Sequence, residues 1–352
     1  MKILDLFETK PFDNTKIRDP YIIAEAGVNH EGDFNIARRL IAEAAEAGAD
    51  AIKFQTYKAN TIASVNSPAY WDLSKESTES QYKLFQKYDK FWKKEYELLK
   101  KYCDSDNIEF LSTPFDIESA KFLNELMNVF KISSSDITNK PFIEYICNFN
   151  KPIILSTGAS TLDEIKQAKN WIDFKKIPLA ILHCILNYPT EDDNAHLGMI
   201  KDLQKEFPLN IIGYSDHTLP KNMKVLETAV MLGSAILEKH FTHDKSLNGN
   251  DHYHSMDKID LLKFKKELKK ILKIIGFQKK NFLDSEIISR KNARRSIVAF
   301  CNIPKDSVIL EKHLTWKRPA TGISPKDIKL IIGKRAKINI REDDLILFEN
   351  IY

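Results

Sequence analysis

Eight short apolar runs, each ending in a polar or ionisable residue, recur through the first two-thirds of the chain at a spacing of one strand and one helix per unit. A helical pattern separates most of them, as in Ile36, Leu40, Ile41, Ala44 and Ala45 after the first run. Eight parallel strands with crossover helices predict an α/β fold, a (β/α)8 TIM barrel. The expected strands are 21–25, 51–55, 109–113, 129–133, 153–156, 180–183, 211–215 and 235–240.

An open, doubly wound sheet is the main alternative to a barrel. A dinucleotide-binding sheet of that kind carries Gly-x-Gly-x-x-Gly after its first strand, whereas residues 25–30 here read Glu-Ala-Gly-Val-Asn-His. Barrel enzymes place their chemistry at the carboxyl ends of the strands, where this chain has Glu, Lys, Gln, Thr, Ser and His. The pattern therefore favours an enzyme.

Composition narrows the class of protein further. The 352 residues are 43% hydrophobic, and Lys and Arg exceed Asp and Glu by only 53 to 49, with the lysines dispersed. This balance argues against nucleic-acid binding. The four cysteines, Cys103, Cys147, Cys184 and Cys301, are far apart in the sequence, which indicates reduced thiols. The sequence pattern suggests neither a signal peptide nor a membrane-spanning run. We therefore expect a cytoplasmic protein.

Two breaks in the repeat suggest the domain organisation. Residues 60–81 have little periodicity and include the aromatic pair Tyr70 and Trp71, which is typical of a substrate wall or lid on the catalytic face. After a helix at 258–275 the chain becomes polar, and from about residue 292 it shows short strand-like runs at 296–300, 337–340 and 345–348. We expect a barrel domain at 1–280, a linker at 281–291 and a small β-rich domain at 292–352.

Ionisable residues at the expected strand ends suggest two kinds of site. His217 and His240 follow neighbouring strands and could hold a divalent metal. Lys53 and Lys131 lie inside apolar strands, where an unpartnered ammonium is costly, so we expect them to meet anions together with Ser134 and Ser156. His252 and His254 are interpreted as structural or substrate-loop residues, because two imidazoles plus water already satisfy such an ion.

A series of motifs in chain order is recognisable. They are Ile-Ala-Glu-Ala-Gly-Val-Asn-His-Glu-Gly at 23–32, Lys-Phe-Gln at 53–55, Ser-Thr-Pro-Phe-Asp at 112–116, Leu-Ser-Thr-Gly at 155–158, His183-Cys184 with Tyr188-Pro-Thr190, Ser-Asp-His-Thr at 215–218 and Glu-Lys-His-Phe-Thr at 238–242. Together they resemble the sialic acid synthase family. The final segment, with Arg294, Arg295-Ser296, Lys317-Arg-Pro319, Gly322-Ile323 and Ile332-Gly333, resembles the antifreeze-like (SAF) domain that ends those enzymes.

This resemblance implies an activity and a set of site residues. The family joins phosphoenolpyruvate to the open-chain aldehyde of an N-acylated mannose-type sugar, with C–O cleavage, giving a nonulosonic acid and phosphate. It implies that His217 and His240 hold Mn2+ or Mg2+, and that Arg318 reaches the active site of the partner in a domain-swapped homodimer. The resemblance also implies that the phosphoenolpyruvate carboxylate is bound by Lys53 and Thr113, and its phosphate by Lys131, Ser134, Ser156 and Ser215. The residues implied to bind or act on the sugar are Glu25, Gln55, Tyr188 and Asp251, and Glu238 would lie near the reacting carbons.

Some positions depart from the family pattern. The segment 131–136 reads Lys-Ile-Ser-Ser-Ser-Asp, so Asp136 is the candidate replacement for a catalytic acid. Leu186 occupies a position where the family often has a polar phosphate contact. Glu76 lies roughly where some members have a sugar-binding asparagine. These changes leave the acceptor open among N-acetylmannosamine, its 6-phosphate and a diacetamido-trideoxy hexose. A Schiff-base aldolase using Lys131 or Lys53, and a non-catalytic carbohydrate-binding protein, remain as alternatives.

Overall fold

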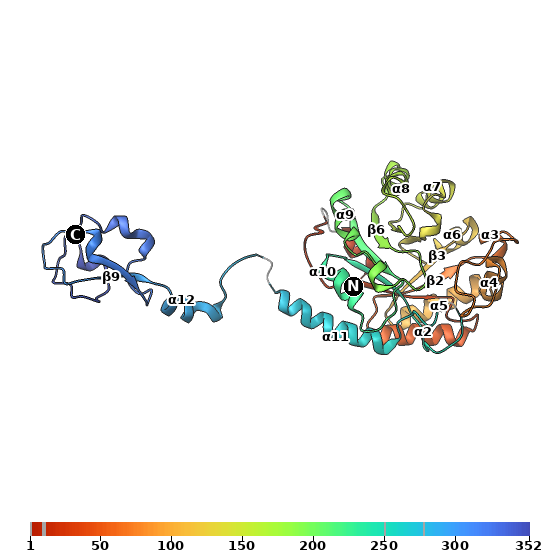
Figure 1. Cartoon of the computed structure of the whole chain (residues 1–352). Coiled ribbons are helices and arrows are strands. Elements are labelled where there is room, and N and C mark those ends of the chain that lie inside the picture. Colours follow the sequence, from red (N-terminus) through yellow and green to blue (C-terminus); the bar gives the residue numbers. More distant parts are fainter. Residues whose placement is uncertain (1, 9–11, 250, 277–278) are drawn as a thin grey trace. The chain divides into compact units, whose positions relative to one another are not determined.

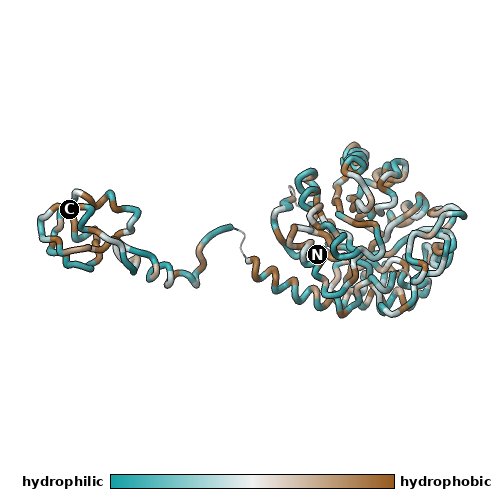
Figure 2. The backbone as a smooth tube through the Cα atoms, in the orientation of Figure 1, coloured by the Kyte–Doolittle hydropathy of each residue, from teal (hydrophilic) through white to brown (hydrophobic). Residues whose placement is uncertain are grey.

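The computed structural model describes residues 2–8, 12–249, 251–276 and 279–352, which form two compact units, Met1–Gly276 and Phe277–Tyr352. Each unit has its own hydrophobic core, and Figure 2 shows apolar and polar residues alternating along their helices. Every helix in these ranges is too short or too polar to cross a bilayer.

The first unit is a barrel of eight parallel strands (Figure 1). The hydrogen-bonded order is β3-β2-β1-β8-β7-β6-β5-β4, so each strand pairs with its chain neighbour and β1 pairs with β8. Among the described strands, only β3 and β4 lack a ladder to each other, which makes the barrel nearly closed. The strands are β1 (Tyr21–Gly27), β2 (Ala51–Thr56), β3 (Glu109–Pro114), β4 (Phe130–Ile132), β5 (Ile153–Ser156), β6 (Leu179–Cys184), β7 (Ile211–Asp216) and β8 (Ile236–His240). The predicted fold class is confirmed.

Helices surround the barrel and cover the outward-facing apolar residues of its strands. Many start at a side-chain cap. Asp33 accepts from two backbone N–H groups at the start of α2, and Thr161 and Glu164 form a capping box on α8. The helices of this unit are α1 (Ile3–Glu8), α2 (Phe34–Glu46), α3 (Ala59–Ile62), α4 (Gln81–Tyr88), α5 (Lys93–Ser105), α6 (Ile117–Leu123), α7 (Lys140–Cys147), α8 (Leu162–Phe174), α9 (Met199–Glu206), α10 (Lys224–Met231) and α11 (Lys258–Ile275).

The amino end of the barrel is closed by a short helix that the sequence patterns did not predict. Ile3, Leu6 and Phe7 of α1 join one apolar cluster with Tyr21, Ile154 and other residues of the barrel strands. Glu109 fixes this contact, since its carboxylate accepts from the backbone of Ile3 and from the Tyr21 hydroxyl at 3.0 and 2.6 Å. Because α1 covers the amino ends of the strands, a functional site is expected at the carboxyl ends.

The second unit contains a two-stranded antiparallel sheet of β9 (Ser296–Ala299) and β10 (Leu314–Lys317), preceded by α12 (Ile287–Ala293). β9 coincides with an expected strand, whereas β10 was not predicted, since its pattern mixes Leu and Trp with polar residues. The runs at 337–340 and 345–348 are not strands. They pair only through isolated bridges, such as Ile303 with Ile340 and Val298 with Leu345, because the chain turns between them.

Candidate functional site

All eight barrel strands contribute to one cavity at their carboxyl ends. This strand-end cavity has a volume of about 370 Å³. It is lined by Glu25 of β1, Lys53 and Gln55 of β2, Thr113 of β3, Lys131 of β4, Ser156 of β5, Cys184 of β6, Ser215 of β7 and Glu238 and His240 of β8, together with Phe115, Ser133, Ser134, Tyr188 and His217. Nearly every site residue predicted for the barrel is thus gathered in one place.

One part of this cavity, here the lysine end, contains Lys53, Lys131, Glu25 and Glu238. All four side chains are at most 8% exposed. Lys53 Nζ contacts Glu25, donates to Thr113 Oγ1 at 3.0 Å and lies 3.9 Å from Glu238 Oε2. Lys131 Nζ lies 3.3 Å from Glu238 Oε1. Two ammonium groups and two carboxylates are therefore matched in charge within the lysine end.

The two carboxylates of the lysine end differ in their affinity for protons. Burial raises the pKa of Glu25, and the neighbouring Lys53 only partly offsets it. Burial also opposes ionisation of Glu238, but Lys131 and Lys53 outweigh it and hold the pKa of Glu238 at about 2. Ser215 Oγ donates to Glu238 Oε1 at 3.1 Å, and Gln55 Nε2 donates to Glu25 Oε1 at 3.1 Å. Glu25 is the carboxyl group that can exchange a proton, and Glu238 stays ionised.

Hydroxyl groups surround the same end. Ser134 Oγ accepts from the backbone N–H of Gly158 at 2.8 Å, and a β-carbon at position 158 would lie 3.0 Å from that oxygen, so glycine permits this close approach. Ser156 Oγ is buried and has no hydrogen-bond partner among the described residues. Ammonium and hydroxyl donors that converge in this way suit a carboxylate or phosphate.

The other part of the site, here the histidine end, contains His217, His240, His254 and Asp251. The His217 and His240 ring centroids are 5.4 Å apart, as predicted for neighbouring strand ends. His217 Nδ1 is bonded to the carbonyl of Ile185 at 2.7 Å, which leaves Nε2 as the free ligand atom. Burial, followed by the neighbouring His240, lowers the pKa of His217 to about 3, so the ring is neutral at physiological pH.

Asp251 connects two imidazoles of the histidine end. Its carboxylate lies 3.4 Å from His240 Nδ1 and 3.6 Å from His254 Nε2. Burial opposes ionisation of Asp251, but His240 and His254 outweigh it and hold its pKa well below the usual range. Buried imidazole nitrogens without hydrogen bonds, close to a carboxylate, are suitable donors for a divalent cation. The residues present therefore fit a metal, and His254 is one that the sequence analysis did not assign to it.

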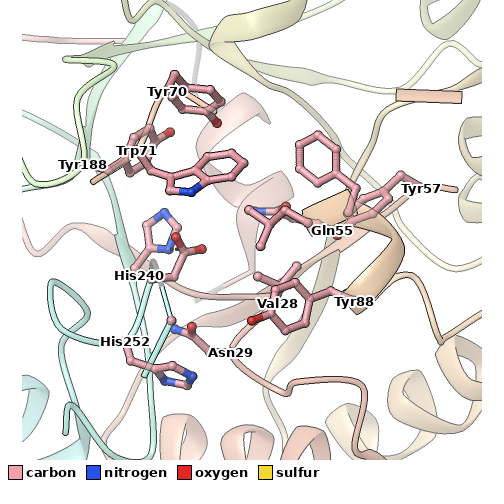
Figure 3. A pocket seen from close by; sticks show the side chains of 14 residues that line it. Val28, Asn29, Gln55, Tyr57, Tyr70, Trp71, Tyr88, Tyr188, His240 and His252 are labelled. Carbon is pink, nitrogen blue, oxygen red and sulfur yellow. Dashed lines mark ion pairs between the residues drawn. The ribbon is translucent and has the colours of Figure 1, made fainter. Parts of the chain in front are cut away.

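A second cavity, here the loop cavity, has a volume of about 700 Å³ and shares Gln55, Tyr188 and His240 with the strand-end cavity. Figure 3 shows Trp71, Gln55 and His240 facing one opening. The long loop expected to form a substrate wall contributes Tyr70 and Trp71. The rest of the lining is Val28, Asn29, Tyr57, Leu84, Phe85, Tyr88, Gly249, Asp251 and His252. Leu84, Phe85 and Tyr88 belong to α4, a helix that their spacing could have predicted.

Four singled-out residues of the barrel unit lie outside the main groups of the site. Asp136 is not among the described residues that line either cavity, and its carboxylate accepts from Asn139 at 3.1 Å, so its catalytic role stays a prediction. Glu76 is buried and paired with Lys87 at 3.0 Å, and Leu186 is 37% exposed. His252 lines the loop cavity, with Nδ1 bonded to Thr242 Oγ1 at 2.8 Å.

Arg318 belongs to the second unit, where it directly follows β10 and is exposed. Its role at an active site stays a prediction.

The barrel, whose strand ends bring lysine, carboxylate and histidine side chains to one cavity, has the architecture of a barrel enzyme. Comparison with known proteins identifies the family. Residues 40–280 match the NeuB family model and residues 294–351 match the SAF domain model, so the chain belongs to the NeuB family. The predicted membership of the sialic acid synthase family is confirmed.

Three similar proteins illustrate the match. N,N'-diacetyllegionaminic acid synthase from Campylobacter jejuni is 41% identical over 92% of this chain and 98% of its own length. Human N-acetylneuraminate-9-phosphate synthase is 31% identical over 94% and 92%. A crystal structure of N-acetylneuraminic acid (sialic acid) synthetase from Leptospira borgpetersenii, in complex with citrate, has a TM-score of 0.69 at 37% identity and covers 77% of this chain and 90% of that one.

Proposed function

We propose that the protein condenses phosphoenolpyruvate with an N-acylated mannose-type sugar aldehyde, giving a nonulosonic acid and phosphate. The observation that carries the proposal is the strand-end cavity, in which Lys53 and Lys131 lie in the same space as His217 and His240. The names of the similar proteins, which include synthases of legionaminic and neuraminic acids, support the same reaction class. Because phosphoenolpyruvate is a cytosolic metabolite, we place the reaction in the cytoplasm.

In this proposal the lysine end binds phosphoenolpyruvate. Lys53 and Thr113, already 3.0 Å apart, bind its carboxylate. Lys131, Ser134, Ser156 and Ser215 bind its phosphate. The lysines are held by Glu25 and Glu238 before the substrate arrives, so little reorganisation is needed to orient them.

The carboxylates divide the remaining work according to their pKa values. Carbon 3 of phosphoenolpyruvate attacks the sugar aldehyde, and positive charge develops on carbon 2. Glu238, which stays ionised, stabilises that charge. Glu25, whose pKa burial raises, accepts the proton of the water that adds to carbon 2. Collapse of the adduct breaks the C–O bond and releases phosphate.

The histidine end orients the sugar aldehyde. His217 and His240 would hold a divalent ion, Mn2+ or Mg2+, and such an ion polarises a carbonyl as a Lewis acid. Tyr188, whose ring centroid lies 4.1 Å from that of His217, and Asp251 would position the sugar chain beside it.

The loop cavity favours an acceptor without a phosphate group. Its described lining is largely aromatic and includes neither Lys nor Arg. An adjoining cavity does have Lys75, Lys87 and Lys90, but also Glu31 and Glu76, and Glu76 already pairs with Lys87. We therefore propose a neutral acceptor, a diacetamido-trideoxy hexose in preference to N-acetylmannosamine 6-phosphate.

The decisive experiment is phosphate release from phosphoenolpyruvate across a panel of acceptors, with mass spectrometry of the product. The neutral sugars should react and the 6-phosphate should react poorly. Phosphoenolpyruvate labelled with 18O at the bridging position should pass its label to phosphate. Label retained in the sugar acid, or trapping of pyruvate on Lys131 or Lys53 by borohydride, would overturn the proposal in favour of different chemistry.

We further propose that Arg318 of a second copy completes each active site in a domain-swapped homodimer. The support is the Lys317-Arg-Pro319 motif and an exposed position directly after β10. His217→Ala and Arg318→Ala should each be nearly inactive. When the two variants are refolded together, mixed dimers should regain one competent site each. Heterodimers without activity would show that Arg318 does not act in the partner's site.

A further inference from the structure

A third histidine lies beside the metal-binding pair predicted from the sequence. His254 is 0% exposed, and neither of its ring nitrogens has a hydrogen bond to any residue that the structure describes. Its ring centroid is 4.9 Å from that of His240. Ligand atoms from His240, Asp251 and His254 all lie within 4.8 Å of one another. Two ligands of one first-row ion are at most about 4.2 Å apart, so small side-chain shifts would close this group around an ion.

The position of His254 is fixed by its own segment. Met256 N–H donates to the carbonyl of His240 at 2.8 Å, and Thr242 N–H donates back to Met256 at 2.9 Å, which joins the segment to the end of β8. Asn29 Nδ2 donates to Ser255 Oγ at 3.0 Å. These contacts on both sides hold the imidazole against His240.

The other buried histidines show what is unusual about this position. His30 accepts from Gly32 N–H at 3.0 Å, His183 is bonded to the carbonyl of Ala195 at 2.8 Å, and His252 is bonded to Thr242 at 2.8 Å. Among the described buried histidines, only His240 and His254 have fully buried ring nitrogens without a well-formed hydrogen bond, and the two share the longer contacts to Asp251 at 3.4 and 3.6 Å. A buried polar group left unbonded costs about 1–3 kcal/mol, which a bound cation would offset.

We propose that His254, with His240 and one carboxylate oxygen of Asp251, is a ligand of the divalent ion, in addition to His217, which leaves the second oxygen of Asp251 for the sugar chain. This inference rests on the metal site of the proposed function but not on its substrates. Three imidazoles and one carboxylate favour first-row transition ions, because Mg2+ prefers oxygen ligands and retained water. The site should therefore select Co2+, Mn2+ or Zn2+ over Mg2+ more strongly than a two-histidine site does.

Titration of metal-free protein with Co2+ tests the proposal without any turnover. We expect His254→Ala to weaken Co2+ binding at least tenfold in calorimetry and to change the visible absorption bands of the bound ion, while Mg2+ binding changes less than threefold. His252→Ala is the matched control, since His252 is buried in the same segment but already hydrogen-bonded; its Co2+ affinity and spectrum should match those of the unmodified protein. Equal Co2+ affinity and spectrum in His254→Ala would overturn the proposal.

Two further measurements cover other outcomes. If His254→Ala does not fold, imidazole nitrogens can be counted by pulsed electron paramagnetic resonance on the unmodified protein with Mn2+, where three supports the proposal and two overturns it. If His254 only positions Asp251, His254→Gln will raise the acceptor KM without changing metal affinity, which also overturns it. Failure of the proposed synthase reaction would leave these metal readouts unaffected.

Discussion

The lysine end and the histidine end meet at the strand-end cavity, where His217 and His240 line the same space as the lysines, but the two ends satisfy their charges in opposite ways. At the lysine end two ammonium groups face two carboxylates, and each carboxylate contacts a lysine. At the histidine end a single carboxylate, Asp251, faces His240 and His254, and ring nitrogens there have no hydrogen bond. The first arrangement is complete as a set of protein groups, whereas the second has donor atoms available for a cation.

This difference indicates how each half would respond to change. A matched buried ion pair is sensitive to loss of one member, because the partner then remains as an uncompensated buried charge. At the histidine end burial lowers the pKa of His217 and His254, whereas burial at His240 is outweighed by Asp251, which raises its pKa. This group is therefore sensitive to loss of the metal and to the protonation state of its rings.

The largest effect is expected from removing the metal ion that the histidine end is proposed to bind. Chelation, or His217→Ala, should reduce kcat by at least about a hundredfold, because Lewis-acid stabilisation contributes several kcal/mol to the transition state. Added Mn2+ should restore the chelated enzyme but not the variant. Phosphate release measures the effect, and full turnover by a chelated sample shown to be metal-free would exclude a metal role.

The next largest effect is expected at the lysine end. Lys131→Met should raise the KM for phosphoenolpyruvate at least tenfold, since a charge-assisted contact contributes about 1.5–3 kcal/mol. It should also lower the free energy of unfolding by about 3–5 kcal/mol, because Glu238 is left buried without this partner. The double variant with Glu238→Gln should regain much of the stability but not the activity. Denaturant unfolding and steady-state kinetics distinguish the two losses, and equal stability of the single and double variants would contradict the pairing.

A third prediction concerns pH and the metal-free protein. Burial lowers the pKa of His217 to about 3. Between pH 6.5 and 3 this residue is therefore protonated in the unfolded chain but neutral in the folded protein. The free energy of unfolding then falls as the pH drops below 6.5, by up to about 1.4 kcal/mol per pH unit. Glu238, with its pKa of about 2, contributes stability above pH 4.5 that is lost as pH falls towards 2. His217→Gln should therefore flatten the stability curve between pH 6.5 and 4.5, whereas Glu238→Gln should alter its slope only below 4.5. If the two variants have the same dependence of unfolding free energy on pH, the separate contributions of His217 and Glu238 are disproved.

The smallest effect is expected from Asp136, which belongs to neither end. Because its carboxylate is bonded to Asn139 and does not line the cavities, Asp136→Asn should change kcat/KM by less than about threefold. Asn139→Ala is a control for loss of the local hydrogen bond. A drop of a hundredfold or more in Asp136→Asn alone would restore the catalytic role predicted from the sequence.

Much of the barrel could be predicted because its parallel strands are buried on both faces and therefore read as continuous apolar runs. The observed strand ends differ from the expected ones by at most two residues. Helices α1 and α4 and strand β10 were missed, since the two helices are only six and eight residues long and the strand mixes apolar and polar residues. The residues of the lysine end follow from strand register alone. His254 does not, because its place beside His240 depends on how the segment after β8 folds back onto that strand.

The missing ladder between β3 and β4 has a consequence for motion. β4 is three residues long and is hydrogen-bonded to β5 alone, while on the β3 side Ser112 N–H donates to the sulfur of Met127 at 2.9 Å. A strand fastened along one edge opens locally at a lower free-energy cost than one fastened along two. Lys131 is the middle residue of β4. We therefore expect Lys131, the proposed phosphate-binding cation, to lie on the barrel strand with the lowest free-energy cost of local opening.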